Sequence, residues 1–473
     1  MSFPGIEPVW RGGALYRRGV NLLVATDRHA IARRAGAIAL VIRVGSAGLA
    51  YVAQVVFARL MGQFEYGLFA YTSVWFLVFA AVASLGFGDS PVRYIAQLRE
   101  RGEIDYLRGF LRFSALVIIV ASVTFSALLV IALPIADRYI DHAYLMPMAL
   151  MAISIPIACL QSLLEGVGRS YNWTLPALLP VYIIRHGLLL AIMTGAVALG
   201  VEATAVNAFI CFALTMVLSL AYQATAILRR LRKVVEPGPR AYRSKEWLRG
   251  SLPFAVLYAA QHLSSFADVL VLSFFVSPAE IAVYFAATRI MQVVNLIPYA
   301  TTVGTAHLYS ASHTRGDHDD VQRLVRHAVV INFVIAAIAV GLLVALGDWL
   351  LGMFGPGFEA GYVPLVILGV GVLARVAAGP VEDILNMTGY GGVSAWAYIV
   401  AVAANVVLAL ILIGPFGLDG AAIAASCALV LKSLSMSISV RRRLGIRTSI
   451  ISAASTWFGA IGSHNAHRRA PAE

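Results

Sequence analysis

Apolar runs alternate with short polar segments along almost the whole chain. The first run extends from 35 to 58. The later runs lie near 67–88, 111–135, 143–164, 175–199, 203–228, 250–276, 281–310, 326–346, 362–384, 393–413 and 418–440. A helix of about 20 apolar residues crosses the hydrocarbon core of a bilayer. The pattern therefore predicts an all-α integral membrane protein with about twelve transmembrane helices.

The stretch from Arg59 to Arg112 indicates how the first two runs are joined and oriented. It opens with a short polar turn at 62–67, continues as an apolar run and ends in a segment rich in arginine. Arginines gathered at one end of a span mark its cytoplasmic side. We therefore expect a hairpin with Glu65 outside. The cytoplasmic segment of this hairpin carries Arg93, Arg99, Arg101, Arg108 and Arg112.

Loops rich in lysine and arginine alternate with loops that have almost none, and this alternation tests the assignment of the spans. The loops assigned to the cytoplasm carry the basic residues of 93–112, Arg169, the 229–249 segment, Arg315, Arg323, Arg326 and the arginines after 440. The loops assigned to the outside carry only Arg59 and Arg138. A missed span would reverse the pattern beyond the error, and no reversal occurs. Both tails, 1–34 and 441–473, are therefore predicted to be cytoplasmic.

The basic segment at 229–249 divides the chain into two similar halves. It contains Pro237-Gly238-Pro239, which is typical of a turn-rich linker. When the second half is shifted back onto the first, the polar turn at 62–65 aligns with 277–280. Each half holds an even number of predicted spans, so both halves have the same orientation in the membrane. We expect two parallel six-helix lobes, 35–228 and 250–440, around a central cleft.

The composition supports a membrane protein and narrows its chemistry. Of 473 residues, 60% are hydrophobic and 13% are charged, which is too apolar for a soluble protein. The net charge of +12 is distributed between spans and is not gathered on one surface, so we expect no nucleic-acid partner. Cys159, Cys211 and Cys427 lie inside separate apolar runs and are interpreted as small buried hydrophobes.

The sequence contains none of the motifs that mark common catalytic or nucleotide sites, such as Gly-x-Ser-x-Gly, Gly-Lys-Ser/Thr or His-Glu-x-x-His. One group of acids and histidines is interpreted as a solvated polar loop. It comprises His307, His313, Asp317, His318, Asp319 and Asp320. We therefore expect a protein that is not an enzyme and that uses no metal and no cofactor.

Four arginines inside predicted spans are the candidate site residues: Arg43, Arg185, Arg289 and Arg375. An arginine at the centre of a membrane helix costs about 2.5–3.5 kcal/mol, so these side chains should face protein or water. They could form a cationic cavity for a diphosphate, because guanidinium groups match phosphate oxygens. They could instead pair internally. Asp268 and Arg289 have matching depths and form a candidate ion pair, whereas no acid is expected at the depth of Arg43 and Arg185.

The first hairpin carries a family resemblance. The sequence RLMGQFEYGLFAY, followed by SLGFGDSPVRYIAQLRERG, resembles the first-hairpin signature of bacterial oligosaccharide flippases in the multidrug/oligosaccharidyl-lipid/polysaccharide (MOP) exporter superfamily. GPFGLDGAAIAASCALVLKSLSMSISVRRRLGI, at 414–446, is similar to that family's last common helix pair. The resemblance covers roughly 35–445. It implies alternating access in the bacterial inner membrane and a polyprenyl-diphosphate-linked oligosaccharide as substrate. Lipopolysaccharide O-antigen, capsule or exopolysaccharide would be the product, with membrane lipids and polysaccharide-assembly proteins as partners.

Two other functions remain open at this point. A drug or organic-cation antiporter of the same superfamily would share the two-lobe architecture, but should have a buried acid in its N-terminal lobe, and the first six spans have none at mid-depth. A membrane-embedded polysaccharide polymerase or ligase should have a large outer loop for its acceptor. The longest predicted outer loops, near 136–142 and 347–361, are short.

Overall fold

The computed structural model describes residues 28–138, 141–295, 297, 318–450 and 452, and these residues form helices and no strand. The α-helices are α2 (Arg28–Ala83), α3 (Ser90–Glu100), α4 (Ile104–Ala136), α5 (Leu145–Ser170), α6 (Thr174–Leu179), α7 (Arg185–Ala198), α8 (Ala205–Val234), α9 (Ser244–Leu272), α10 (Pro278–Gln292), α12 (His318–Ala345), α13 (Gly347–Gly352), α14 (Tyr362–Ala377), α15 (Val381–Met387) and α16 (Gly391–Leu444). Short turns of other helix types are η1 (His142–Tyr144), η2 (Pro180–Ile184), η3 (Val293–Asn295) and η4 (Phe358–Gly361). The prediction of an all-α membrane protein is confirmed.

Two of the long helices are hairpins that fold back at a glycine. In α2 the backbone leaves helical geometry at Gly62, with φ 74° and ψ 173°, a region that is essentially restricted to glycine. The hydroxyl of Tyr66 donates to Oε1 of Gln54 at 2.8 Å, although twelve residues of straight helix would separate these positions by about 18 Å. Gly417 makes the same break in α16, with φ 55° and ψ −128°. The predicted hairpin at 62–67 is therefore present.

Nine helices in the described part of the chain are long and apolar enough to cross a membrane, and α2 and α16 each supply two antiparallel arms. The predicted span at 281–310 begins as α10 and continues into residues outside the described ranges. The predicted span at 362–384 is shorter than expected. It ends with α14 at Ala377, because Gly379 has φ 86° and Pro380 has no N–H to continue the helix. The count of twelve spans remains a prediction.

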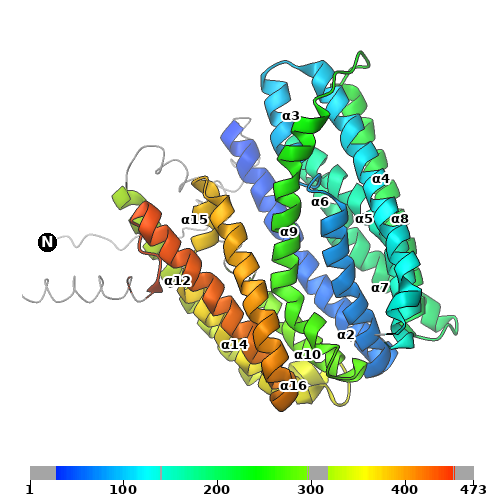
Figure 1. Ribbon diagram of the computed structural model, residues 1–473, viewed down its shortest axis with the longest axis vertical. Coiled ribbons are helices and arrows are strands. Elements are labelled where there is room, and N and C mark those ends of the chain that lie inside the picture. The colour runs from blue at the N-terminus through cyan, green and yellow to red at the C-terminus, as the bar shows by residue number, and fades with distance from the viewer. Residues whose placement is uncertain (1–27, 139–140, 296, 298–317, 451, 453–473) are drawn as a thin grey trace, which may run out of the picture.

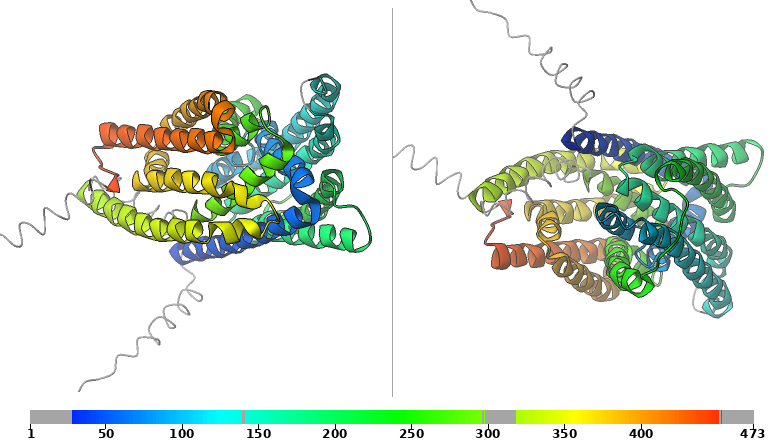
Figure 2. Two further views of the ribbon diagram at one scale, coloured as in Figure 1. Left: turned by 90° about the horizontal axis from the view of Figure 1, so that it is seen from below. Right: turned by 90° about the horizontal axis from the view of Figure 1, so that it is seen from above.

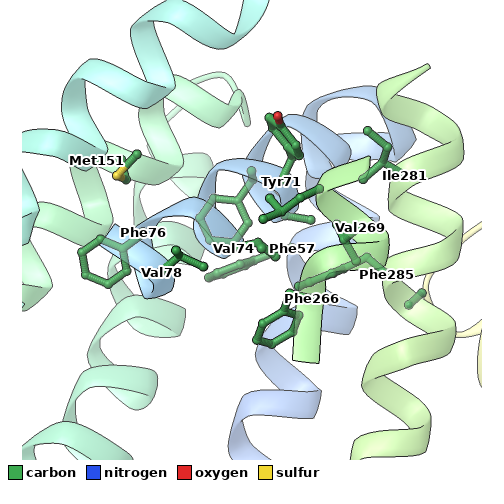
Figure 3. Close-up of a cluster of buried hydrophobic side chains, with 14 of the residues drawn as sticks. Phe57, Tyr71, Val74, Phe76, Val78, Met151, Phe266, Val269, Ile281 and Phe285 are labelled. Atoms are coloured by element: carbon green, nitrogen blue, oxygen red, sulfur yellow. The ribbon is translucent and has the colours of Figure 1, made fainter. Parts of the chain in front are cut away.

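The helices form two lobes, with α2 to α8 in the first and α9 to α16 in the second (Figure 1). Viewed along the long axis of the molecule, α12, α14 and α16 lie on one side, and α4 to α8 lie on the other (Figure 2). α2 packs against α5 within its own lobe and against α9 and α10 of the other lobe. Figure 3 shows this shared core, where Phe57 and Val74 lie near Phe266 and Phe285. The two lobes are confirmed, and their residue boundaries remain predictions.

Loops that the charge pattern assigns to one side of the membrane lie together at one end of the molecule. The bends at which α2 and α16 fold back lie at one end (Figure 1), and we call it the Gly62 end after the glycine in the bend of α2. α3 and the linker between α8 and α9 lie at the other, which we call the linker end (Figure 1). The non-helical part of the linker is 235–243, because α8 continues to Val234 and α9 starts at Ser244.

The linker is docked on the charged segment that follows the first hairpin. Arg108 donates from Nε to the carbonyl oxygen of Glu236 at 2.6 Å and pairs through Nη1 with Asp105 at 2.7 Å. Arg243 pairs with Glu103 at 3.2 Å. These contacts tie the segment that joins the lobes to the first lobe.

Aromatic packing strengthens the same attachment. Trp247, at the start of α9, is 1% exposed and its ring lies 5.4 Å from that of Phe110. The hydroxyl of Tyr94 on α3 donates to the carbonyl oxygen of Glu246 at 3.2 Å. Burial raises the pKa of Tyr94, which keeps this hydroxyl protonated as a donor. α9 of the second lobe is therefore anchored to the first lobe at the linker end.

Candidate functional site

Two neighbouring cavities lie between the lobes, and we call them together the cleft. The cavity nearer the Gly62 end has a volume of about 360 Å³ and the cavity nearer the linker end has a volume of about 410 Å³. They share Phe76, Leu77 and Arg185 as lining residues. The first lobe contributes α2, the segment between α2 and α3, α5, η2, α7 and α8 to the walls, and the second contributes α9, α10 and η3. The site therefore depends on how the two lobes are placed.

Arg185 stands where the two cavities meet, and a local irregularity of the helix precedes it. The predicted span at 175–199 consists of α6, one turn of π-helix at Pro180–Ile184 and α7. The N–H of Arg185 bonds to the carbonyl oxygen of Pro180, five residues earlier. Such π-turns occur often at functional sites. The Nη1 of Arg185 lies 3.7 Å from the sulfur of Met216, a weak acceptor, which leaves the guanidinium available to a ligand in the cleft.

Arg43 and Arg289 line the cleft on either side of Arg185. The guanidinium of Arg43 lies 4.2 Å from the ring centroid of Tyr182 in the linker-side cavity. Arg289 lines the Gly62-side cavity, where Nη1 donates to Oε1 of Gln292 at 2.7 Å and the guanidinium lies 4.2 Å from the ring of Phe285. The cleft thus receives one arginine from each of α2, η2–α7 and α10.

The predicted pair between Asp268 and Arg289 is not formed within the described residues. The carboxylate of Asp268 accepts a hydrogen bond from the hydroxyl of Tyr284, and Arg289 bonds to Gln292 instead. The physical reason is the direction of each side chain, since Asp268 is 4% exposed in the core while Arg289 lines the cavity. Equal depth in the membrane did not imply that the two groups face each other.

Arg375 lines neither of the two cavities, and it lies in the last turn of α14. Its electrostatic partners are Tyr398, Glu382 and Asp383 in the second lobe. Glu382 also accepts hydrogen bonds from the hydroxyl of Tyr398, at 2.8 Å to each oxygen. Arg375 therefore lies near the end of a helix and not in the middle of the longer span that the sequence predicts.

Two acids and one arginine in the linker-side cavity are not among the site residues that the sequence predicts. Asp89 and Glu165 line it together with Arg169, whose Nη1 lies 2.9 Å from Asp89 and 3.8 Å from Glu165. Glu165 lines the same cavity as Arg43 and Arg185, so an acid lies near both, whereas the sequence predicts none at their depth in the membrane. The spacing of Glu165 and Arg169, four residues apart on one helix, was a signal that could have placed them together.

The second lobe also contributes Tyr258 and His262 to this cavity. Within the described residues, no group of three or more histidine, cysteine, aspartate or glutamate side chains could hold a metal ion. The acid and histidine group at 307–320 lies partly outside those residues, so its interpretation as a polar loop remains a prediction. The cleft offers cationic and hydrogen-bonding groups, and its net charge is positive.

Several contacts join the lobes at the Gly62 end. Arg59 donates from Nε to the carbonyl oxygen of Met353 at 2.5 Å, and Gln63 donates to that of Pro356 at 3.1 Å. Tyr66 is fully buried, and its ring lies 6.1 Å from that of Phe358. The backbone of Gly67 touches Pro278 so closely that a Cβ there would lie 1.8 Å from the Pro278 oxygen. The polar turn of the first hairpin is thus a contact surface for the other lobe.

Solved structures share this fold at low sequence identity. An inward-facing conformation of a multidrug resistance MATE family transporter of the MOP superfamily is 16% identical, with a TM-score of 0.64 over 94% of this chain and 99% of that chain. The lipid II flippase MurJ in an inward closed conformation is 16% identical, with a TM-score of 0.66 over 85% and 87% of the two chains. A MOP superfamily transporter from Pyrococcus furiosus, described as having a binding pocket of reverse polarity, is 17% identical, with a TM-score of 0.62 over 90% and 98%.

Family models give the assignment. The search of curated proteins finds no match. The MatE model matches residues 253–411, in the second lobe. The model described as polysaccharide biosynthesis protein matches residues 33–306, which is more than half of the chain. The chain therefore belongs to the polysaccharide biosynthesis protein family, and it shares the fold of these MATE and MurJ structures.

Proposed function

We propose that this protein moves a polyprenyl-diphosphate-linked oligosaccharide across the bacterial inner membrane by alternating access. The product would be lipopolysaccharide O-antigen, capsule or exopolysaccharide. Both termini and the linker would lie in the cytoplasm, and polysaccharide-assembly proteins would be partners on either side. The observation that carries the proposal is the convergence of Arg43, Arg185 and Arg289 on one cleft between the lobes.

The chemistry of the cleft suits a diphosphate. Guanidinium groups bind phosphate oxygens through parallel hydrogen bonds, and they keep their charge at any physiological pH. Arg169 is already matched by Asp89 and Glu165, whereas Arg185 contacts the sulfur of Met216 and Arg289 contacts the neutral side chain of Gln292. Two of the three arginines that carry the proposal belong to the first lobe and one belongs to the second. A diphosphate that engages all three would stabilise one placement of the lobes over another, which is what a transported ligand must do.

The size of the cleft limits what enters it. The two cavities, of about 360 and 410 Å³, suit a diphosphate and the sugars next to it. A polyprenyl chain is much larger and apolar, so it would remain in the bilayer while the head group passes between the lobes. This division explains why charged residues line the cleft although lipid surrounds the protein.

An organic-cation antiporter is the second candidate. It is favoured by the match of the second lobe to the MatE model, and by the acids Asp89 and Glu165 in the cleft. Against it, four arginines and two acids line the two cavities, so the cleft repels a cationic substrate more than it attracts one. The two candidates differ in the expected effect of removing an arginine from the cleft. The loss should slow transport of a lipid-linked oligosaccharide but should favour transport of a cation.

The test replaces Arg43 and Arg185 by alanine, singly and together, in a strain whose own copy is deleted. Each arginine should contribute charge-assisted hydrogen bonds of about 1.5–3 kcal/mol, so each single variant should lower surface polysaccharide by roughly ten- to hundredfold at equal protein abundance. Arg→Lys should be intermediate, because the charge remains and the planar fork is lost. Arg229→Ala, on the surface at the end of α8, is the matched control and should behave as the parent.

Three results would count against the proposal. Normal surface polysaccharide in the double alanine variant would show that the arginines bind no essential ligand. Loss of protein in parallel with loss of polysaccharide would show that they hold the fold together. The antiporter would be favoured if the parent exports a cationic dye, the deletion strain does not, and the alanine variants export it faster than the parent.

A further inference from the structure

A third cavity, of about 520 Å³, lies outside the cleft at the linker end. Its walls are the first turns of α4, the last turns of α8 and the linker segment 235–240. We call it the α4–α8 pocket. It opens to the surface and is separate from the residues proposed to carry the substrate.

The α4–α8 pocket presents positive charge that the protein does not neutralise. Arg108 forms an ion pair with Asp105 and donates hydrogen bonds to carbonyl oxygens of the linker. Arg112, Arg232 and Arg240 also line the pocket and are exposed, and none has a hydrogen-bond or ion-pair partner within the part of the chain that the structure describes. Glu236 is the one acid among its described lining residues.

The same pocket has an apolar side next to the predicted membrane spans. Leu111 and Leu228 line it, and they stand where the sequence predicts that the spans of α4 and α8 reach the cytoplasmic boundary of the bilayer. Leu231 and Val235 continue this surface along α8 toward the linker. Apolar side chains at membrane depth with unpaired arginines immediately beyond them match one class of ligand, a lipid with an anionic head group.

We propose that the α4–α8 pocket binds an anionic glycerophospholipid such as phosphatidylglycerol. The phosphate would lie among Arg112, Arg232 and Arg240, and an acyl chain would lie against Leu111 and Leu228. A soluble phosphate compound would leave those leucines uncovered, which is why the lipid is the better occupant. The bound lipid would bridge α4, α8 and the linker, so it would stabilise the docked linker that joins the lobes. This site adds to the proposed transport and does not depend on it.

The experiment titrates the full-length protein in neutral detergent with short-chain phosphatidylglycerol and follows the rise in thermal midpoint. Phosphatidylcholine of the same chain length and glycerol 3-phosphate are the comparison ligands. The variant combines Arg112→Gln, Arg232→Gln and Arg240→Gln. Its matched control combines Arg229→Gln, Lys233→Gln and Lys245→Gln, three exposed basic residues of the same region that do not line the pocket.

Phosphatidylglycerol should stabilise the parent and the control with equal affinity. The pocket variant should bind it about a hundredfold more weakly, since each basic side chain near an anionic lipid contributes roughly a fivefold change in affinity. Its midpoint without lipid should stay near that of the parent, which shows that it folds. Equal stabilisation by phosphatidylcholine, equal affinity of the pocket variant, or stabilisation by glycerol 3-phosphate alone would each overturn the proposal.

Discussion

Gly67→Ala tests whether the contact between the lobes at the Gly62 end holds the cleft closed on that side. The new Cβ would lie 1.8 Å from the carbonyl oxygen of Pro278 and 2.5 Å from its carbon. An ordinary contact between carbon and oxygen is about 3.3–3.6 Å, so α2 and α10 must separate by roughly 1.5 Å. Overpacking of this kind costs about 1–3 kcal/mol. The cost falls on the closed arrangement alone, because Pro278 belongs to the other lobe.

The assay measures how often the cleft opens at the Gly62 end. A single cysteine replaces Ser73, which lines the Gly62-side cavity, in a chain whose three native cysteines have been removed. A membrane-impermeant maleimide is then added to intact cells. A shift of about 1–3 kcal/mol changes the population of the open state by roughly 5- to 150-fold, and the labelling rate of Ser73→Cys should rise by that factor in the Gly67→Ala chain.

Two controls make the result interpretable. Gly48→Ala is the same exchange in the same helix at a position where a Cβ meets nothing within 4 Å, and it should leave the labelling rate unchanged. Ser277→Cys, at the Gly62 end itself, should react equally in all backgrounds and reports abundance and sidedness. An unchanged labelling rate at Ser73 beside Gly67→Ala would refute the idea that this contact closes the cleft.

Three further predictions follow from the ends of the molecule. A cysteine at Ala360 should react with an impermeant reagent outside intact cells, whereas one at Ser244 in the linker end should not; the reverse pattern would overturn the predicted topology. Glu65→Ala removes the acceptor for the N–H of Ala205 at the start of α8, a 2.6 Å bond, and should lower the free energy of unfolding by about 0.5–2 kcal/mol, seen as a lower thermal midpoint. Arg108→Gln removes charge-assisted bonds worth about 1.5–3 kcal/mol and should speed tryptic cleavage of the linker, so an unchanged cleavage rate would show that the linker is not held there.

The fold could be predicted largely from the sequence because the membrane imposes its rules locally. A span must be apolar over about 20 residues, and its flanking charges report its direction, so neither property requires knowledge of the other spans. The hairpin at Gly62 and the basic linker between the lobes illustrate this, whereas the docking of that linker depends on contacts between distant residues such as Arg108 and Glu236. α14 is the exception, since its end at Ala377 is set by Gly379 and Pro380 and not by hydropathy.

The candidate site was harder to predict because depth along a helix does not give rotation about it. In a membrane protein all faces of a spanning helix are mostly apolar, so hydropathy does not distinguish the inward face from the lipid face. Packing against neighbouring helices decides which face turns inward. Asp268 and Arg289 have similar depth, yet one faces the core and the other faces the cleft. Contacts between distant parts of the chain, such as Arg59 with Met353, leave no local signal at all.

The closed Gly62 end limits how transport could be driven. Tyr66 is fully buried there beside Phe285, Phe354 and Phe358 of the second lobe, and exposing about 150 Å² of such a ring costs roughly 4 kcal/mol. Opening on this side would then be rare, at about one part in a thousand, unless something stabilises the open state.

A ligand stabilises the open state only by binding it more tightly than it binds the closed state. In the proposed transport the arginines would supply a means, because Arg43 and Arg185 belong to the first lobe and Arg289 belongs to the second. A diphosphate that engages all three in one placement of the lobes and two in the other would differ in affinity by about the strength of one charge-assisted contact, 1.5–3 kcal/mol. The gain from Arg289 is smaller than the cost of exposing Tyr66 but of the same order, so under the proposed transport a single arginine in the second lobe would offset roughly half of that cost and would bias the direction in which the cleft opens.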